Sequence, residues 1–551
     1  MKVNKNYILL FLIILVAAFL RLSNLGTVPP SATVDEVSIG FNAYSILKTG
    51  ADEYGDKLPV LLRAYDDWRP ALYVYLVIPF VALLDLTVLS VRLPSAILSI
   101  ISLVSFYFLV KELFKDFKPK IEIRSFQMGI AELATLFLAV SPWHIYISRL
   151  GHEVNAFFSF LLLGIFFFLR FLSGKSWNLI LSSIFLGLSF SAYQSGKIVV
   201  PILLVILLLL YFKKLFREKT YFLASVLVGF LIVIPIISQS FGDNSLIRYK
   251  ATSIFLNSPA YFEEVSERYA SDLENEDLLG QVFDNRKVAS VLLVSKAYLS
   301  HFDPVWLSFN SGYEPFKAPV IGLLYLFELP LIFFGILFLL KSQIKPKFFV
   351  LILLWGLVAV LPGSITTGNP HAMRSFAILP VLQILAALGF TGILVFIKNK
   401  RLQWSFLTVS IFVLLTSVLW FHHSYFSLLP KELYHHFQYG PAIAFSEVKK
   451  LENNYDEIIV SNKDILFESY MFYLYINKYD PHLYQESGGT VSGGFDKEHR
   501  IGKYYFGGIE NKLGEKRLYV INPEEVTEGM KIVKEIKYPN EEVALLITEI
   551  K

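Results

Sequence analysis

Apolar runs of about twenty residues recur along this chain and constrain its fold more than any other feature. A run of this length is needed for a helix to cross the hydrocarbon core of a bilayer. The ranges that fit are 7–22, 92–110, 126–142, 154–172, 177–193, 198–212, 220–238, 319–340, 348–362, 375–397 and 404–421. The chain of 551 residues is 54% hydrophobic, whereas a soluble domain has roughly 45–50% apolar residues. The sequence therefore predicts a polytopic α-helical membrane protein with about eleven spans.

The bulk composition excludes several other classes of protein. The formal net charge is only +4, which gives no basis for binding nucleic acid. The chain has no cysteine, so disulfides and thiolate metal sites are excluded. The N-terminus has a basic start and a long apolar run without a small-residue cleavage site. We therefore interpret residues 7–22 as a retained first helix and not as a cleaved signal peptide.

The basic residues predict the topology, because Lys and Arg collect in cytoplasmic loops. Five lie between Lys111 and Arg124, four between 213 and 219, three between 341 and 347, and three between 398 and 401. The loops on the other side carry one each: Arg149, Lys197 and Arg374. This alternation places the N-terminus in the cytoplasm only if the apolar run 71–90 does not cross. We therefore expect 71–90 to be an external juxtamembrane or re-entrant helix, broken near Pro79.

Three regions then lie outside the plasma membrane: the first loop (23–91), a long loop (239–318) and the tail (422–551). The tail mixes charge with short β-like runs at 457–462, 517–522 and 542–550, and apolar helical stretches such as DILFESYMFYLYI lie between them. We expect a transmembrane catalytic domain over 1–421 and a small extracytoplasmic α/β domain over 422–551, with the C-terminus outside.

Polar residues gather in the external loops. The first loop carries the acidic pair Asp35–Glu36, and the later short loops carry Arg149, His152, Glu153, Lys197, His371 and Arg374. Arginine and lysine can hold phosphate oxygens, and a carboxylate can take a proton from an acceptor hydroxyl. This combination suggests a site for an anionic, partly lipidic substrate.

Each of these residues also has an ordinary structural interpretation. The acidic pair could be solvated or cap a helix, and the cations could be interfacial anchors that extend to lipid headgroups. Glu132 and Glu328 fall inside predicted spans, and an intramembrane carboxylate is a functional candidate by default. Each could equally be protonated or paired with a neighbouring helix, so we assign neither to the site.

Several motifs in order resemble the GT-C superfamily of lipid-carrier-dependent glycosyltransferases. More narrowly, the chain is similar to the group with protein O-mannosyltransferases and lipid A aminoarabinose transferases, over roughly residues 5–400. After the acidic pair comes WRPALYVYL, with Arg69, where relatives usually have two prolines and this chain has Pro70 then Ala71. The other matching segments are VRLPSAI (91–97), SPWHIYISRLGHEVNAFF (141–158), SAYQSGKIVVP (191–201), YLSHFDPVWLSFNSGYEP (298–315) and GNPHAMRSFAILPVLQILAALG (368–389). Glu153 stands where many relatives have Asp.

The resemblance implies a GT-C fold and an inverting transfer. The donor is then a sugar on a polyprenyl phosphate or pyrophosphate, with its chain in a groove among the spans. Asp35 matches the general base, with Glu36 and Glu153 as the other catalytic candidates. Glu153 either orients the acceptor or binds a cation together with Asp35.

The resemblance also implies cationic residues that stabilise the leaving phosphate. The candidates are Arg69, Arg149, Lys197, His371 and Arg374, with Arg374 first because arginine binds phosphate bidentately. Some GT-C enzymes need a divalent cation and others do not, so the metal is unknown.

Two alternatives stay open. A lipid or glycolipid transporter or flippase would also have about a dozen spans, although transporters often show internal repeats and midplane polar groups, which this sequence does not. A catalytically inactive relative acting as a partner is the other alternative. The sequence names neither the sugar nor the acceptor, which is a protein, a lipid or a glycan. By position, the tail is the natural place to recognise that acceptor.

Overall fold

The computed structural model describes residues 5–65, 67–117, 121–123, 126–240, 250–310, 316–341, 344–490, 499–510, 512 and 514–550. The chain forms two compact units. The helical unit comprises Met1–Leu20, Ser99–Ile147 and Val154–Val418, and the mixed unit comprises Arg21–Leu98, Ser148–Glu153 and Leu419–Lys551. The mixed unit therefore joins the first loop, one short later loop and the tail. The end of the matching segment 298–315 lies outside the described residues.

The helical unit consists mainly of long apolar helices. Their bounds are α1 (Lys5–Leu22), α4 (Val88–Leu113), α5 (Ile130–Val140), α6 (Pro142–Ser148), α7 (Val154–Leu172), α8 (Asn178–Ala192), α9 (Gly196–Arg217), α10 (Lys219–Ser240), α16 (Glu328–Lys341), α17 (Pro346–Ala359), α18 (Leu361–Ser364), α19 (Leu379–Phe396) and α20 (Lys400–His423). A small hairpin of β3 (Ile121–Ile123) and β4 (Phe126–Met128) precedes α5. Helices α1, α4, α6 and α20 extend into the mixed unit.

The polytopic character is confirmed, but the count of eleven spans is not. Among the described residues, seven helices are long and apolar enough to cross a membrane, or eight if α5 and α6, bent by 57°, form one span. Helix α16 has only 14 residues, or about 21 Å against about 30 Å of hydrocarbon. The expected span 319–340 is shorter because residues before Glu328 are not helical. There Leu324 N–H bonds Leu307 O and the Tyr325 hydroxyl bonds Val140 O.

The apolar run 71–90 forms α3 (Leu72–Leu84), a helix of 13 residues. At about 20 Å it is shorter than the hydrocarbon core. The expected break near Pro79 is wrong, because the helix continues through this residue, which lies on its exposed side. The helix ends instead at Asp85, whose φ is 62°.

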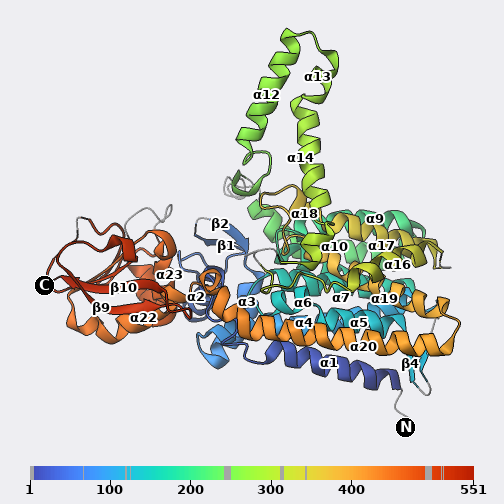
Figure 1. Ribbon diagram of the computed structural model, residues 1–551, viewed down its shortest axis with the longest axis horizontal. Coiled ribbons are helices and arrows are strands. Elements are labelled where there is room, and N and C mark those ends of the chain that lie inside the picture. The colour runs from blue at the N-terminus through green and yellow to red at the C-terminus, as the bar shows by residue number, and fades with distance from the viewer. Residues whose placement is uncertain are drawn as a thin grey trace. The chain divides into compact units, whose positions relative to one another are not determined.

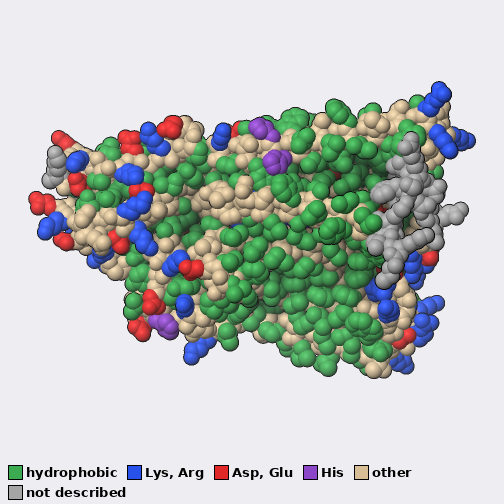
Figure 2. Space-filling view, turned by 90° about the horizontal axis from the view of Figure 1, so that it is seen from below, with side chains coloured by type: hydrophobic (Ala, Val, Ile, Leu, Met, Phe, Trp, Pro, Cys, Tyr) green, Lys and Arg blue, Asp and Glu red, His purple; other side chains and the backbone are tan. Residues whose placement is uncertain are grey.

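Close backbone contact holds α16 against α19. A Cβ added to Gly335 would lie 1.9 Å from Leu385 O, and one added to Gly389 would lie 1.9 Å from Leu331 O. Small residues at such contacts are typical of helices packed within membranes. The outer surface of these helices is largely hydrophobic, and Lys and Arg side chains gather at one end of them (Figure 2).

A helical hairpin lies between α10 and α16 in the chain. It consists of α12 (Pro259–Glu274), α13 (Leu278–Phe283) and α14 (Arg286–Ser300), and α15 (Pro304–Ser308) follows. Helices α12 and α14 lie side by side, with α13 at the tip (Figure 1).

The mixed unit contains α2 (Val34–Thr49), the hairpin of β1 (Leu61–Ala64) and β2 (Asp67–Pro70), and a C-terminal α/β domain. The domain's helices are α21 (Leu429–Glu432), α22 (Tyr439–Leu451), α23 (Ser469–Asn477) and α24 (Pro481–Glu486). Its strands are β5 (Glu457–Val460), β6 (His499–Ile501), β7 (Tyr504–Phe506), β8 (Arg517–Ile521), β9 (Met530–Lys537) and β10 (Val543–Ile550). The short non-α turns of the chain are η1 (Phe376–Ile378), η2 (Ser424–Leu428), η3 (Tyr434–Phe437), η4 (Glu452–Asn454), η5 (Asp464–Leu466) and η6 (Pro523–Glu525).

The C-terminal sheet has the strand order β6-β7-β5-β8-β10-β9. Strand β5 is parallel to β7 and β8, and β10 is antiparallel to β8 and β9. The three β-like runs read from the sequence form β5, β8 and β10, so the predicted α/β domain is confirmed. Helices α23 and α24 pack on α2, and a Cβ at Gly40 would lie 2.5 Å from the ring of Tyr475. The tail therefore packs directly against the helix that carries the acidic pair.

Candidate functional site

The acidic pair lies in the first turn of α2. Thr33 caps the helix: its Oγ1 accepts a bond from Glu36 N–H at 3.2 Å, and Glu36 Oε2 accepts from Thr33 N–H at 2.9 Å. This reciprocal arrangement is a capping box, and it follows from Thr and Glu three residues apart. The box turns Glu36 inward, and Asp35, one position earlier, points elsewhere because successive helical residues are about 100° apart.

Glu36 is buried and fully bonded. Its oxygens accept two bonds from the Arg92 guanidinium, at 2.7 and 2.9 Å, and Oε1 also accepts one from Gly151 N–H at 2.7 Å. Arg92 in turn donates to the carbonyls of Leu25, Pro29 and Ser31. We call Thr33, Glu36, Arg92 and Gly151 the Glu36 anchor. It ties together three segments that are distant in the sequence.

Asp35 is 55% exposed and is held by Arg69. Arg69 Nη1 donates to Asp35 Oδ1 at 3.2 Å, and Nη2 donates to Ser38 Oγ at 2.7 Å. Strand β2 places Arg69 opposite Leu62 of β1, and the guanidinium is buried. A bond to each of two α2 side chains fixes the carboxylate of Asp35 while leaving it accessible.

His152 and Glu153 complete this group. His152 Nε2 lies 3.9 Å from Asp35 Oδ2, and Nδ1 lies 3.4 Å from Glu153 Oε2. We call Asp35, Arg69, His152 and Glu153 the Asp35 cluster. Although burial opposes its charge, the carboxylates of Asp35 and Glu153 raise the pKa of Arg69. The cluster therefore holds one permanent cation near two carboxylates.

Sequence reasoning missed a third carboxylate near Asp35. Burial raises the pKa of Glu468 to about 7, the charge of Asp35 adds to this rise, and Arg69 opposes it. Its position follows from Tyr470, whose ring meets that of Tyr65 edge-on at 6.2 Å, while the Tyr65 hydroxyl bonds Val34 O. The only sequence signal was a carboxylate inside the largely apolar stretch DILFESYMFYLYI, which also begins with Asp464.

Two further buried carboxyls lie where α2 meets the C-terminal domain. Glu53 accepts bonds from Asn42 Nδ2 at 3.1 Å and Thr490 Oγ1 at 2.8 Å. Burial raises the pKa of Glu53 to about 7 and that of neighbouring Asp52 to about 6. These groups link the first loop to the tail and were not singled out from the sequence.

Arg149, predicted to bind phosphate, is buried in the mixed unit. Its Nη2 donates to Val28 O at 2.8 Å, and its guanidinium lies 4.7 Å from the ring centre of Phe426. Burial lowers its pKa. These contacts are typical of a cation that supports the packing of the loop bearing His152 and Glu153.

The other predicted cations lie in the helical unit. Arg374 Nη1 donates to Thr366 Oγ1 at 2.8 Å and to Thr367 O at 2.6 Å. His371 Nδ1 accepts from Arg374 N–H at 3.4 Å. Lys197 is the second residue of α9, and nearby Ser195 Oγ donates to Arg374 O at 3.2 Å. The structure thus brings Lys197, His371 and Arg374 into one group of loops, and it places Asp35, Glu36, Arg69, Arg149 and Glu153 in the mixed unit.

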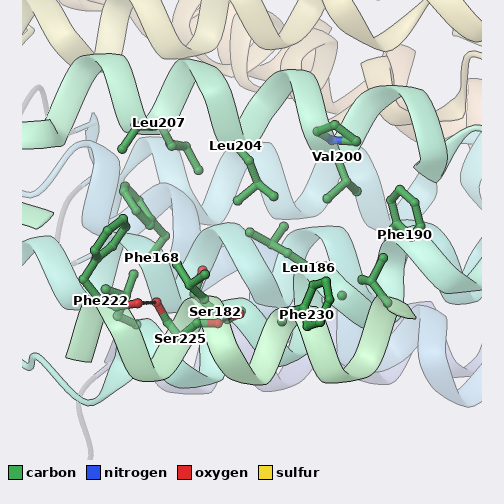
Figure 3. Close-up of a pocket in the computed structure, with 18 of the residues that line it drawn as sticks. Phe168, Ser182, Leu186, Phe190, Val200, Leu204, Leu207, Phe222, Ser225 and Phe230 are labelled. Atoms are coloured by element: carbon green, nitrogen blue, oxygen red, sulfur yellow. Dashed lines mark hydrogen bonds between the residues drawn. The ribbon is translucent and has the colours of Figure 1, made fainter. Parts of the chain in front are cut away.

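In the part of the chain that the structure describes, His, Asp and Glu side chains form no group of three or more suited to a metal ion. A cavity of about 480 Å³ lies among α7, α8, α9 and α10. Side chains such as Leu186, Leu204 and Phe230 line it (Figure 3). A lining of this kind suits hydrocarbon and not a phosphate.

Comparisons with known proteins agree with this architecture. Residues 69–238 match the family described as dolichyl-phosphate-mannose-protein mannosyltransferase, which is less than half of the chain. No curated protein matches the chain. Among solved structures, ArnT from Cupriavidus metallidurans bound to undecaprenyl phosphate matches with a TM-score of 0.55 at 12% identity, over 98% of this chain and 97% of ArnT.

Two more distant structures match less of their own length. The oligosaccharyltransferase of Archaeoglobus fulgidus, tethered with an acceptor peptide, matches with a TM-score of 0.49 at 12% identity, over 86% of this chain and 63% of that chain. The chain thus spans less than two thirds of that enzyme. The S. cerevisiae Pmt1–Pmt2 complex bound to the sugar donor has a TM-score of 0.34 at 18% identity, over 44% and 36%.

The likeness to ArnT over nearly all of both chains shows that this protein has the GT-C fold, with a small C-terminal sheet domain. The likeness to ArnT gives the fold of the whole chain, and residues 69–238 are similar to the mannosyltransferase family.

Proposed function

We propose that the protein transfers a sugar from a polyprenyl-phosphate carrier to an extracytoplasmic hydroxyl with inversion, and that Asp35 is the general base. The observation that carries this proposal is the exposed carboxylate of Asp35, which buried Arg69 holds by one oxygen. ArnT, which shares the fold, was crystallised with undecaprenyl phosphate, and the matching family is named for a dolichyl-phosphate sugar.

In the proposed reaction, Asp35 takes the proton of the acceptor hydroxyl as its oxygen bonds to the anomeric carbon. The bond from that carbon to the phosphate oxygen breaks on the opposite face, and its electron pair leaves with the phosphate. A positioned base contributes ~10²–10⁴-fold in rate. Arg374, Lys197 and His371 are the proposed groups that stabilise the phosphate, because cations at that oxygen lower the barrier.

Within this proposal the other site residues act through position. Arg69 orients Asp35 and Ser38 through its two Nη atoms, Arg149 supports the 148–153 loop, and Glu36 anchors α2. Glu153 orients His152 next to Asp35. Arg69 and Arg149 are therefore not proposed as phosphate ligands, because their buried guanidinium groups already donate hydrogen bonds to the protein.

The test compares purified wild type with Asp35→Asn on a panel of polyprenyl-phosphate sugars and native membrane extract. Mass spectrometry follows loss of sugar from the lipid. Asp85→Asn is the matched control, because Asp85 is exposed in the same unit and Asn tolerates its positive φ. We expect Asp35→Asn to bind donor without consuming it and the control to behave as wild type. Equal turnover by wild type and Asp35→Asn would overturn the assignment.

The lysine-rich helix ends support an orientation in the plasma membrane. We propose that these ends face the cytoplasm, with the N-terminus inside and the C-terminal domain outside. Because the chain has no cysteine, single cysteines at Lys213 and Asp480 can be labelled in cells with an impermeant maleimide. Labelling at 480 and protection at 213 is the expected result, and the reverse would contradict the orientation.

We also propose that the C-terminal domain helps to recognise the acceptor, which is a protein, lipid or glycan. The packing of α23 and α24 on α2 supports this role. Deletion of 422–551 would expose the face of α2 around Gly40, so substitutions are the better test. Glu468→Ala is expected to lower transfer to the native acceptor more than hydrolysis of the donor, with Glu486→Ala as the control. An equal loss of both activities would contradict a role in acceptor recognition.

A further inference from the structure

The hairpin α12–α14 has a packed inner side. Phe262 and Val265 of α12 are buried, the Tyr261 hydroxyl donates to Ala289 O at 3.2 Å, and the Arg286 guanidinium lies 5.0 Å from the ring centre of Phe262. These contacts hold α12 against α14. The hairpin is therefore an ordered element with two outer sides, one on each helix.

The two outer sides differ in chemistry. Helix α12 exposes charged residues that include Glu263, Glu264 and Glu267. The tip and α14 instead expose large apolar side chains: Leu278 (75%), Leu279 (71%), Val282 (58%), Phe283 (64%), Val291 (65%), Leu292 (56%) and Leu299 (66%). These exposed fractions are similar to those of residues on the membrane helix α10, such as Leu223 at 66% and Leu227 at 59%. In water, an apolar patch of this kind marks a protein or membrane contact.

The base of the hairpin joins the membrane helices at one end. The Tyr298 hydroxyl donates to Leu357 O at 2.9 Å, and Ile254 N–H donates to Ile365 O at 3.2 Å. Leu357 lies near the end of α17 opposite its lysine-rich start. Leu353 and Leu357 are themselves exposed, so the apolar side of α14 continues the lipid-facing surface of α17.

We propose that α13 and α14 lie in the bilayer interface at this end of the helical unit, with their apolar side chains inserted into one leaflet and α12 facing water. Figure 1 agrees, because α12 and α14 run across the direction of α9, α17 and α19. An amphipathic element that lies in the membrane plane buries its apolar face at the headgroup–acyl boundary.

The charge of the hairpin defines how it binds. Residues 259–300 contain eight Asp or Glu and four Lys or Arg, so the hairpin gains nothing from anionic headgroups. Between Val288 and Ser295 α14 carries no charged residue. Insertion is therefore driven by burial of apolar surface, and it is insensitive to salt.

The absence of native cysteine makes a direct test simple. The full chain carries one cysteine, from Val282→Cys, Leu292→Cys or, as the matched control on the polar side, Glu267→Cys, labelled with a fluorophore sensitive to its surroundings. Each protein is reconstituted at one copy per phosphatidylcholine nanodisc. Quenching is measured with a nitroxide on a shallow acyl carbon of the lipid and with aqueous iodide.

We expect the lipid nitroxide to quench labels at 282 and 292 at least about threefold more than the label at 267, and iodide to show the opposite order. The pattern should persist at 1 M salt. Equal access of iodide to all three labels would overturn the proposal. The apolar surface of α13 and α14 would then be a candidate contact for a protein partner. Protection that appears only with two copies per disc would also overturn it, in favour of a contact between copies of the chain. Thermal unfolding of each variant confirms that the exposed substitutions keep the fold.

Discussion

The Asp35 cluster and the Glu36 anchor begin at adjacent residues, yet they differ in almost every physical respect. Glu36 is buried and accepts bonds from a guanidinium and two backbone amides. Asp35 is exposed, and Arg69 holds it by one oxygen. A buried carboxylate must have its bonding capacity satisfied, whereas a base must keep an oxygen accessible to its substrate. The comparison separates a carboxylate that builds the site from one that acts in it.

The largest expected effect falls on Asp35. Asp35→Asn should lower turnover by ~10²–10⁴-fold and change thermal unfolding much less than Glu36→Gln does. The Asp35 carboxylate is exposed, and Glu153 remains as a second counter-charge for Arg69. Donor-consumption assays and differential scanning fluorimetry on one preparation check both parts. If Asp35→Asn unfolds at a clearly lower temperature and its loss of turnover follows its loss of folded protein, Asp35 has a structural role like that of Glu36.

The Glu36 anchor should give the opposite result. Glu36→Gln leaves the buried Arg92 guanidinium without its counter-charge, which costs about 3–5 kcal/mol of unfolding free energy. Chemical unfolding in detergent measures the loss. The double variant Glu36→Gln with Arg92→Met should lose less than the sum of the single losses, because it removes the uncompensated charge. A stable but inactive Glu36→Gln would instead make Glu36 part of the reaction.

Local patterns in the sequence predicted much of this architecture. Long apolar runs identified the membrane helices, and β-branched runs identified β5, β8 and β10. The capping box is also local, with Thr33 and Glu36 three residues apart. What the sequence could not show was which of the two acidic residues would be buried. That depends on Arg92, 56 positions away, and on Gly151, 115 positions away.

The misses at residues 319–327 and at Glu468 originate in tertiary contacts. Residues 319–327 are apolar enough for a span, but bonds to Leu307 and Val140 hold them outside the helix. Helix α3 accepts Pro79 on its exposed side. Glu468 lies near Asp35 because α23 packs on α2. No sequence motif predicts this contact.

Arg69 ties Asp35 to the buried side of α2, since its guanidinium donates to Asp35 Oδ1 and to Ser38 Oγ. Arg69→Lys keeps the charge but cannot reach both Asp35 and Ser38 in the same fork geometry. We expect kcat to fall about tenfold through loss of orientation, with KM for the donor little changed. Steady-state kinetics measure the split. A rise in KM at constant kcat would assign Arg69 to binding the donor.

The smallest expected effect concerns Glu468. It tests whether this carboxyl of the C-terminal domain is electrostatically coupled to Asp35. Its pKa is raised from 4.5 to about 7, chiefly by burial and then by the charge of Asp35. Between these values the folded state binds a proton that the unfolded state has released, so rising pH lowers the free energy of unfolding. The contribution is fully present below about pH 4.5 and is lost as pH rises through about 7.

Asp52 and Glu53 act in the same direction, so the informative quantity is the difference in unfolding free energy between wild type and a variant. Wild type should lose about 1 kcal/mol more than Glu468→Gln over this range, after allowance for partial exposure. Asp35→Asn removes one charge that raises the pKa of Glu468, so it should reduce the same loss in part. If the free energy of unfolding of wild type and of Glu468→Gln depends on pH in the same way, Glu468 is not coupled to the Asp35 cluster. The C-terminal domain then contributes no charge to that cluster.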